Sequence, residues 1–174
     1  MQPATPWSSC AQCEGLKEVI DARRLWDSCV VIGYLAGYED LKPECPLIIE
    51  QAERGEIQIV VSAMATIEVA YLAGSSDPES EAMIREFFTR EYIVPVGIDV
   101  SIASIARELI RKYRNAPKIK PVDAAHFATA IQWHIPVIET TDPDLLRLNE
   151  LEGNPTVRIR RPLYEGARTM FGDT

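Results

Sequence analysis

Acidic side chains follow the predicted strands of this chain, where strands give way to helices. Asp27 ends the first strand, Glu68 lies in the helix after the second, and Asp123 begins a helix of small residues. Asp142 and Asp144 follow a further strand. Because the carboxyl ends of parallel strands meet at one edge of a sheet, we expect these acids to converge. Clustered carboxylates repel one another and call for a divalent cation such as Mg²⁺ or Mn²⁺, which binds phosphate oxygens and activates water.

Each of these acids also has an ordinary structural explanation. An Asp beside a helix start is usually an N-cap that accepts a backbone hydrogen bond, and Asp123 and Asp142 both stand at helix starts. Asp144 fits equally well as a first-turn charge that complements the helix dipole. His126 lies near the predicted site, and a packed or solvated histidine is the favoured interpretation over a catalytic base. The acids indicate a shared site only as an ordered set.

Apolar segments predict the elements that must position these acids. Runs rich in β-branched residues and bounded by turn residues predict strands at Leu25-Trp26, Ile57–Val61, Tyr92–Val96, Pro136–Glu139 and Thr156–Ile159. Helices are predicted at Cys29–Leu35, Leu47–Glu53, Ala63–Leu72, from Asp77, at Ser101–Tyr113, at Val122–Trp133 and from Asp142 through Leu148. Strands separated by helices need crossovers, so we expect a three-layer α/β/α sandwich with a mostly parallel sheet of four or five strands.

Length and composition bound the class of protein. The chain has 174 residues, of which 47% are hydrophobic and 25% charged, which excludes disordered, collagen-like and disulfide-scaffold classes. We expect one domain at residues 23–162, an N-terminal appendage at 1–22 and a C-terminal tail at 163–174. No run of about 18 apolar residues and no signal peptide are recognisable, so we expect no membrane partner and a cytoplasmic location.

Charge is distributed unevenly along the chain. The formal net charge is −8, which is not typical of a general binder of nucleic acids or anionic membranes. Residues 1–100 carry 17 acidic and seven basic side chains, whereas residues 101–174 carry nine acidic and 11 basic ones. A polyanion should therefore meet the C-terminal part, where five candidate RNA-binding cations precede Asp123 without an intervening acid: Arg111, Lys112, Arg114, Lys118 and Lys120. A solvated helix end explains them equally well, and a weaker second strip consists of Arg158, Arg160 and Arg161.

The four cysteines carry a weaker signal. Cys10 and Cys13 form a C-x-x-C, which fits half a zinc site or a redox pair, but no second pair of ligands accompanies it. Cys29 and Cys45 stand alone. Four reduced thiols are the favoured interpretation.

The order of the acids resembles that of the PIN-domain ribonucleases, and most of all the VapC-type toxin of toxin–antitoxin pairs. The family opens with a strand, an Asp, a hydroxyl residue and an apolar helix, as in LWDSCVVI at 25–32. Its second acid lies in a helix after the second strand, as in SAMATIEV at 62–69. Its third opens a small-residue helix, as in PVDAAHFATA at 121–130, and its last segment is matched by TTDPDL at 140–145. The resemblance extends from Arg24 to Leu148.

This resemblance implies a PIN-like fold and a metal-dependent endoribonuclease. Mg²⁺ or Mn²⁺ would be held by the four catalytic acids, Asp27, Glu68, Asp123 and Asp142. Ser28 and Thr140 would hydrogen-bond the acids or the attacking water, and Asp144 would be an auxiliary acid. The resemblance also implies an RNA substrate, an antitoxin protein as partner, and a homodimer.

Two other function classes remain open at this point. Glu68 with the later Asp142-x-Asp144 also resembles the acids of a TOPRIM-type nuclease, although Asp27 and Asp123 are then unexplained and the usual Gly beside the Glu is missing. The other is a non-catalytic PIN-like module that binds RNA or a protein. Binding alone has no use for clustered like charge, which favours the enzyme.

Overall fold

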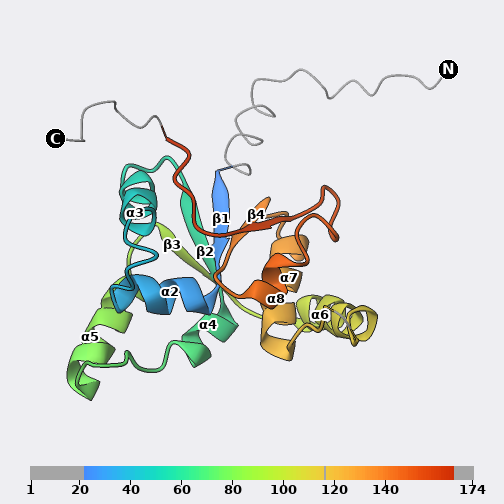
Figure 1. Cartoon of the computed structure of the whole chain (residues 1–174), viewed down its shortest axis with the longest axis horizontal. Helices are drawn as coiled ribbons and strands as arrows, with labels where there is room; N and C mark the ends of the chain where they lie inside the picture. Colours follow the sequence, from blue (N-terminus) through green and yellow to red (C-terminus); the bar gives the residue numbers. More distant parts are fainter. Residues whose placement is uncertain (1–21, 116, 167–174) are drawn as a thin grey trace.

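Strands and helices alternate along the chain (Figure 1). The computed structural model describes residues 22–115 and 117–166. Its strands are β1 (Arg23–Trp26), β2 (Gln58–Ser62), β3 (Ile93–Val96), β4 (Val137–Glu139) and β5 (Arg158–Arg160). Its helices are α2 (Ser28–Leu35), α3 (Cys45–Glu53), α4 (Ala63–Glu68), α5 (Asp77–Phe88), α6 (Val100–Lys112), α7 (Pro121–Gln132) and α8 (Pro143–Leu146). None of the helices in these ranges is long and apolar enough to cross a membrane.

The five strands form one sheet in the order β3-β2-β1-β4-β5, and every neighbouring pair is parallel. The central strand is β1, where Leu25 aligns with Val60 of β2 on one side and with Ile138 of β4 on the other. The predicted three-layer α/β/α sandwich is confirmed, with the larger of the two expected strand counts.

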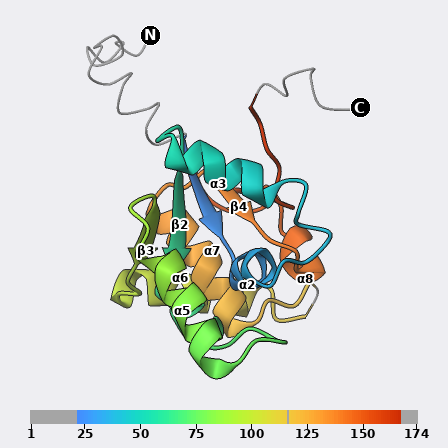
Figure 2. The same cartoon turned by 90° about the vertical axis from the view of Figure 1, so that its left-hand side faces the viewer.

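Alternate side chains of the strands face two separate apolar layers, as the period of two in a strand requires. Leu25 and Val60 pack with apolar residues of α6, α7 and α8. Their neighbours Trp26, Ile59 and Val61 pack on the other face with α2, α3 and α5. In Figure 1 these two groups of helices lie on opposite sides of the strands, and Figure 2 looks from the side of α2, α3 and α5. Both faces of the sheet are therefore covered, which is why the consecutive residues Ile59, Val60 and Val61 of β2 are all apolar and buried.

The strand order reverses at β1. The chain builds β2 and β3 outward on one side of β1 and then returns to place β4 and β5 on the other. Such a reversal leaves a crevice outside the carboxyl ends of the strands, between β1 and β4. Asp27 follows β1 and Thr140 follows β4, so both lie at this crevice.

Most predicted elements differ from the observed ones by one or two residues at an end, and one helix ends four residues earlier. The helix predicted at Ala63–Leu72 stops at Glu68, because the chain leaves the helical conformation at Val69 and buries Val69 and Leu72 separately. The backbone N–H of Leu72 then bonds the hydroxyl of Ser80 in α5. The helix predicted through Leu148 ends at Leu146, and the last strand runs over Arg158–Arg160 instead of Thr156–Ile159.

A buried ion cluster attaches the C-terminal segment to the sheet. Glu139 of β4 is completely buried and accepts hydrogen bonds from Trp26 Nε1 at 2.8 Å, Arg160 at 3.2 Å and Arg24 at 3.3 Å. Arg24 and Arg160 also pair with Glu165, at 3.2 and 2.5 Å. The contacts of the domain therefore extend to Glu165, past the expected boundary at 162. The expected appendage at 1–22 lies almost entirely outside the described residues.

Candidate active site

Asp27 is held at the end of the central strand by hydrogen bonds to both of its oxygens. It is the N-cap of α2, and its Oδ1 accepts the backbone N–H of Ser28 at 2.7 Å. Its Oδ2 accepts the Thr140 hydroxyl at 2.6 Å and the Cys29 thiol at 3.1 Å. Asp27 is only 4% exposed. Its carboxylate is therefore fixed in one orientation at the crevice.

The Cys29 thiol belongs to this arrangement as a neutral donor. Burial, together with the nearby charge of Asp27, raises the pKa of Cys29 to about 11, so it stays protonated at neutral pH. Its sulfur in turn accepts the backbone N–H of Thr141 at 3.2 Å. Within the described part of the chain Cys29 and Cys45 are free thiols, whereas Cys10 and Cys13 lie outside it.

Thr140 and Asp142 join the end of β4 to the start of α8. The Thr140 hydroxyl accepts the backbone N–H of Asp142 at 3.0 Å while donating to Asp27. Asp142 is the N-cap of α8, and its Oδ1 accepts the backbone N–H of Asp144 at 2.7 Å. Burial raises the pKa of Asp142, but its bonds with Lys120 and with the Asp144 N–H outweigh burial and hold that pKa below its usual value. Asp142 is thus an ionised cap that also faces the crevice.

Asp144 points elsewhere. Its carboxylate lies 2.9 Å from Arg147 in an exposed pair, and it is not among the described residues that line the pocket. This position fits the first-turn charge of α8 better than the auxiliary acid.

Asp123 is not the N-cap that its sequence position suggested. Lys120 occupies the N-cap position of α7, Pro121 follows, and Asp123 is the third helical residue. Asp123 is 8% exposed, and its Oδ2 has no hydrogen-bond partner among the described residues. Burial, and then the charges of Asp27 and Asp142, raise the pKa of Asp123. A buried carboxylate oxygen without a donor, facing two other acids, is a feature that a bound cation would satisfy.

Glu68 reaches the site from the last turn of the short helix α4. Its Oε2 accepts the Ser28 hydroxyl and lies 3.1 Å from Nε2 of His126. The hydrogen bond from His126 is the main reason why the pKa of Glu68 is lowered. Ser28 therefore donates its hydroxyl to Glu68 of α4 and its backbone N–H to Asp27, which follows β1.

His126 is a buried connector that the sequence did not assign to the site. It is fully buried; its Nδ1 lies 2.8 Å from the Ser62 hydroxyl, and its Nε2 faces Glu68 and Asp27, the latter at 3.3 Å. Two carboxylates facing Nε2 favour the tautomer with the proton on that nitrogen, so the ring donates to Glu68 while Asp27 Oδ1 lies nearby without a hydrogen bond from it. The favoured interpretation of a packed histidine thus holds, and the imidazole also orients Glu68. Its spacing of three from Asp123 places both on one helix face, a signal available in the sequence.

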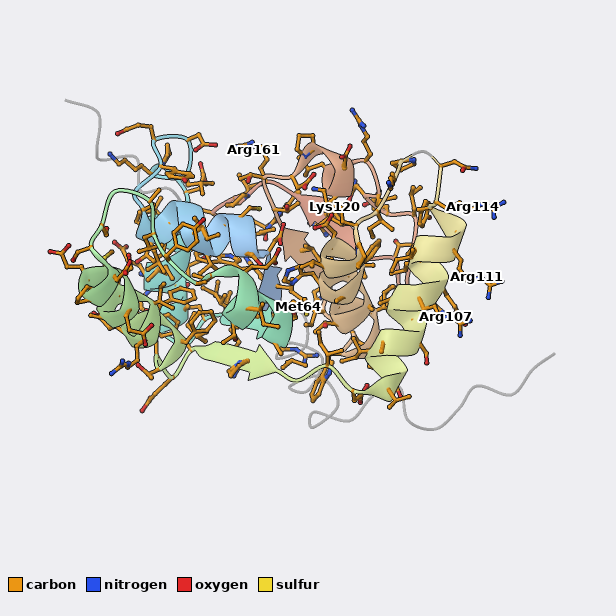
Figure 3. The ribbon with its side chains drawn as sticks, turned by 90° about the horizontal axis from the view of Figure 1, so that it is seen from below. Met64, Arg107, Arg111, Arg114, Lys120 and Arg161 are labelled. Carbon is orange, nitrogen blue, oxygen red and sulfur yellow. The ribbon has the colours of Figure 1, made fainter. Side chains whose placement is uncertain are left out.

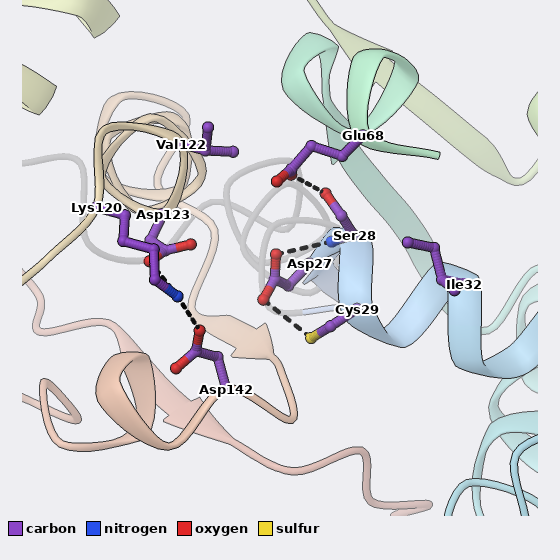
Figure 4. Close-up of a pocket in the computed structure, with 9 residues that line it drawn as sticks. All are labelled: Asp27, Ser28, Cys29, Ile32, Glu68, Lys120, Val122, Asp123 and Asp142. Carbon is purple, nitrogen blue, oxygen red and sulfur yellow. Dashed lines mark hydrogen bonds and ion pairs between the residues drawn. The ribbon is translucent and has the colours of Figure 1, made fainter. Parts of the chain in front are cut away.

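The four predicted acids line one pocket of about 380 Å³ (Figure 4). Its lining consists of Asp27, Ser28, Cys29, Ile32, Glu68, Lys120, Val122, Asp123 and Asp142. One oxygen each of Asp27 and Glu68 and one nitrogen of His126 also lie within 4.8 Å of one another. Because the N–H of the imidazole bonds Glu68, Nε2 has no free lone pair for a metal, and the carboxylate oxygens are the better ligands. Hard carboxylate oxygens with the unpartnered Asp123 Oδ2 among them fit Mg²⁺ or Mn²⁺.

The candidate RNA-binding cations separate into different groups. Lys120 extends into the pocket, with Nζ 3.0 Å from Asp142 Oδ2, so it is not independent of the acids. Lys112 pairs with Glu152 at 2.5 Å. The remaining predicted cations are exposed and form no ion pair with the described residues. They are Arg111, Arg114 and Lys118. Arg107, one turn before Arg111, continues this row along the outer edge of α6 in Figure 3, and the sequence stretch had omitted it.

The three arginines of the weaker second strip already form ion pairs with acidic side chains. Arg158 and Arg160 pair with Glu165, and Arg161 lies 2.6 Å from Asp40. These pairs make the three arginines poor candidates for phosphate contacts.

Comparison with known proteins agrees with this fold. The sequence matches the PIN domain family over residues 25–151, which is most of the chain. The chain therefore belongs to the PIN domain family. No curated protein sequence matches it closely enough to count as a relative.

Solved structures share the fold. The VapBC2 structure from Rickettsia felis, bound to a DNA fragment from the promoter, aligns with a TM-score of 0.61 at 11% identity, covering 80% of this chain and 98% of that chain. VapC20 of Mycobacterium tuberculosis, described as a sarcin-ricin loop cleaving toxin, aligns with a TM-score of 0.53 at 12% identity, covering 70% and 92%. At such identities the likeness establishes the PIN-like fold.

Proposed function

We propose that this protein is a metal-dependent endoribonuclease that hydrolyses RNA phosphodiester bonds and is the toxin of a toxin–antitoxin pair. The observation that carries the proposal is the buried Asp123 Oδ2, which accepts no hydrogen bond from the described residues, lies 3.9 Å from Lys120 Nζ, and faces the charges of Asp27 and Asp142. A fold keeps such a group at a cost of about 1–3 kcal/mol. A site that binds a cation explains why this chain tolerates that cost.

The ion would be held by the four predicted acids, Asp27, Glu68, Asp123 and Asp142. When bound, Mg²⁺ or Mn²⁺ supplies positive charge for a scissile phosphate and lowers the pKa of a water molecule. The chain's own contribution is to hold the carboxylates in place before the substrate arrives. Thr140 orients Asp27, Ser28 and His126 orient Glu68, and the N-terminus of α8 orients Asp142.

The exposed cations of α6 would hold the RNA backbone. Arg107, Arg111 and Arg114 recur at spacings of four and three, so they share one helix face. Lys118 follows in the connection that leads to α7 and its Asp123. Guanidinium and ammonium groups of this kind contact phosphates and position a strand without reading its sequence.

The proposed partners follow from the same likeness. VapBC2 is a complex of two proteins by its description, and an antitoxin protein is the corresponding partner that we propose here. A homodimer is proposed from the family resemblance. The TOPRIM-type alternative does not account for Asp27 and Asp123, which both line the pocket.

The test is RNA cleavage with matched variants. The purified protein is incubated with total RNA in EDTA, in Mg²⁺ and in Mn²⁺, beside the variants Asp27→Asn and Asp99→Asn. Asp99 caps α6 and is exposed away from the pocket, so it controls for the loss of one charge. We expect cleavage that requires the metal, survives in Asp99→Asn and disappears in Asp27→Asn. RNA binding without cleavage under every condition would instead support the non-catalytic PIN-like module.

A further inference from the structure

Lys120 places a positive charge among the acids of the pocket. Its Nζ lies 3.0 Å from Asp142 Oδ2 and 3.9 Å from Asp123 Oδ2, as Figure 4 shows. Among the described lining residues it is the sole cation. Its side chain is 60% exposed, whereas those of Asp142 and Asp123 are 20% and 12% exposed. The ammonium therefore enters the pocket from solvent and meets acids that the fold has already fixed.

We propose that Lys120 is a built-in counter-cation of the metal-free site, which a divalent ion must displace when it binds. This inference rests on the proposed function, because it presumes that the acids hold a metal. The oxygens beside Lys120 are the ones the ion needs, and Asp123 Oδ2 in particular lacks any other donor among the described residues. Two cations cannot share these oxygens, since at a few ångströms they repel one another strongly.

The lysine is suited to such a displacement. A Lys side chain is a compact charge on a flexible four-carbon stem, and here most of that stem is in solvent. It can leave the acids without moving the backbone, which is anchored by the buried Ile119 before it and by the buried Ala124 of α7. Once displaced, the same ammonium stands at the rim of the pocket, where a phosphate would enter. The pair with Asp142 thus lowers metal affinity and stabilises the metal-free protein.

The test measures Mn²⁺ binding and stability, without any RNA. Mn²⁺ affinity is determined by calorimetry, and the thermal midpoint is measured in EDTA and in Mn²⁺, for the parent protein and for Lys120→Met, Lys120→Arg and Lys118→Met. Lys118 is the matched control, because it is an exposed lysine two residues away that is not among the described lining residues. An exposed ion pair of ordinary strength corresponds to about a two- to fivefold change in an equilibrium constant.

We expect Lys120→Met to bind Mn²⁺ about two- to fivefold more tightly and to melt at a lower temperature in EDTA. Its metal-induced rise in midpoint should exceed that of the parent, and Lys120→Arg and Lys118→Met should match the parent. If Lys120→Met binds Mn²⁺ no more tightly than Lys118→Met does, the proposed displacement is wrong. Mn²⁺ binding by both variants would still support the metal site. If the parent and all the variants fail to bind Mn²⁺, both the displacement and the proposed metal site fall.

Discussion

Replacing Asp123 by Asn separates a metal ligand from a structural acid. The change keeps the shape of the side chain and removes one negative charge from a group that is 8% exposed. Two effects on the metal-free protein oppose each other. Relief of the buried charge without a hydrogen bond is worth about 1–3 kcal/mol, and loss of that charge, which complements the start of α7 and lies 3.9 Å from Lys120 Nζ, costs about 0.5–2 kcal/mol. The net expectation lies between a loss of about 1 kcal/mol and a gain of about 2.5 kcal/mol in the free energy of unfolding, so the thermal midpoint in EDTA should fall by no more than roughly 4 °C and can rise by roughly 10 °C, since each kcal/mol shifts it by about 2–4 °C.

The gain should depend on pH in a defined direction. Because the pKa of Asp123 is raised in the folded protein, folding takes up protons as the group titrates. Its contribution to stability is fully present below the unfolded pKa and is lost as the pH rises through the folded pKa. Asn does not titrate, so the advantage of Asp123→Asn over the parent should grow with rising pH and disappear in acid.

Activity should move the other way. Loss of a metal ligand removes several kcal/mol of charge stabilisation, so Mn²⁺-dependent RNA cleavage should fall about a hundredfold or more. The assay pairs initial cleavage rates with melting in EDTA, and Asp99→Asn is the matched control because Asn also caps α6. Nearly intact cleavage by Asp123→Asn would falsify the place of this acid in the site, and a strong loss of metal-free stability would refute the argument from its unpartnered oxygen.

Three further predictions concern other parts of the molecule. The pKa of Glu68 is lowered mainly by the hydrogen bond from His126. In EDTA the parent should therefore be more stable than Glu68→Gln at neutral pH, and this advantage should be lost as the pH falls through the lowered pKa. An advantage that persists in strong acid contradicts this. Arg111→Ala should weaken RNA binding and reduce the slope of log affinity against log salt by about one, measured by fluorescence anisotropy, and an unchanged slope returns Arg111 to a solvated helix face. Glu139→Gln leaves the buried Arg24 and the partly buried Arg160 dependent on the more exposed Glu165 for negative charge, so urea unfolding should give a loss of about 3 kcal/mol. A loss below roughly 1 kcal/mol would show that the cluster is not stabilising.

The order of elements could be predicted from the sequence because it depends on local patterns. Apolar runs such as Ile57–Val61 are too short for helices and too apolar for exposed strands, so they predict buried parallel strands. Crossover helices between them then require a parallel sheet with helices on both faces. The same reasoning placed the acids at the carboxyl edge, and the structure brings all four into one pocket.

The ends of elements and the partners of single side chains could not be predicted in this way. The helix that carries Glu68 ends there because Val69 and Leu72 are buried by elements distant in sequence. The helical periodicity of the segment cannot reveal those distant elements. In the sequence, His126 is a polar residue in a helix of mostly small and apolar residues, with no sign of what it contacts. Only the approach of α4 and β1 to α7 places Glu68 and Asp27 at its Nε2.

The sequence by itself therefore determined the fold class and which acids follow which strands, because periodicity and turn residues act over a few neighbouring positions. Only the tertiary structure decided what each charge faces. It paired Lys120 with Asp142, placed His126 against Glu68, and left Asp123 Oδ2 without a hydrogen-bond donor among the described residues. The physical reason is that burial and Coulomb interactions depend on distance in space. Residues such as Lys120 and Asp142, which are 22 positions apart, become neighbours only when the chain folds.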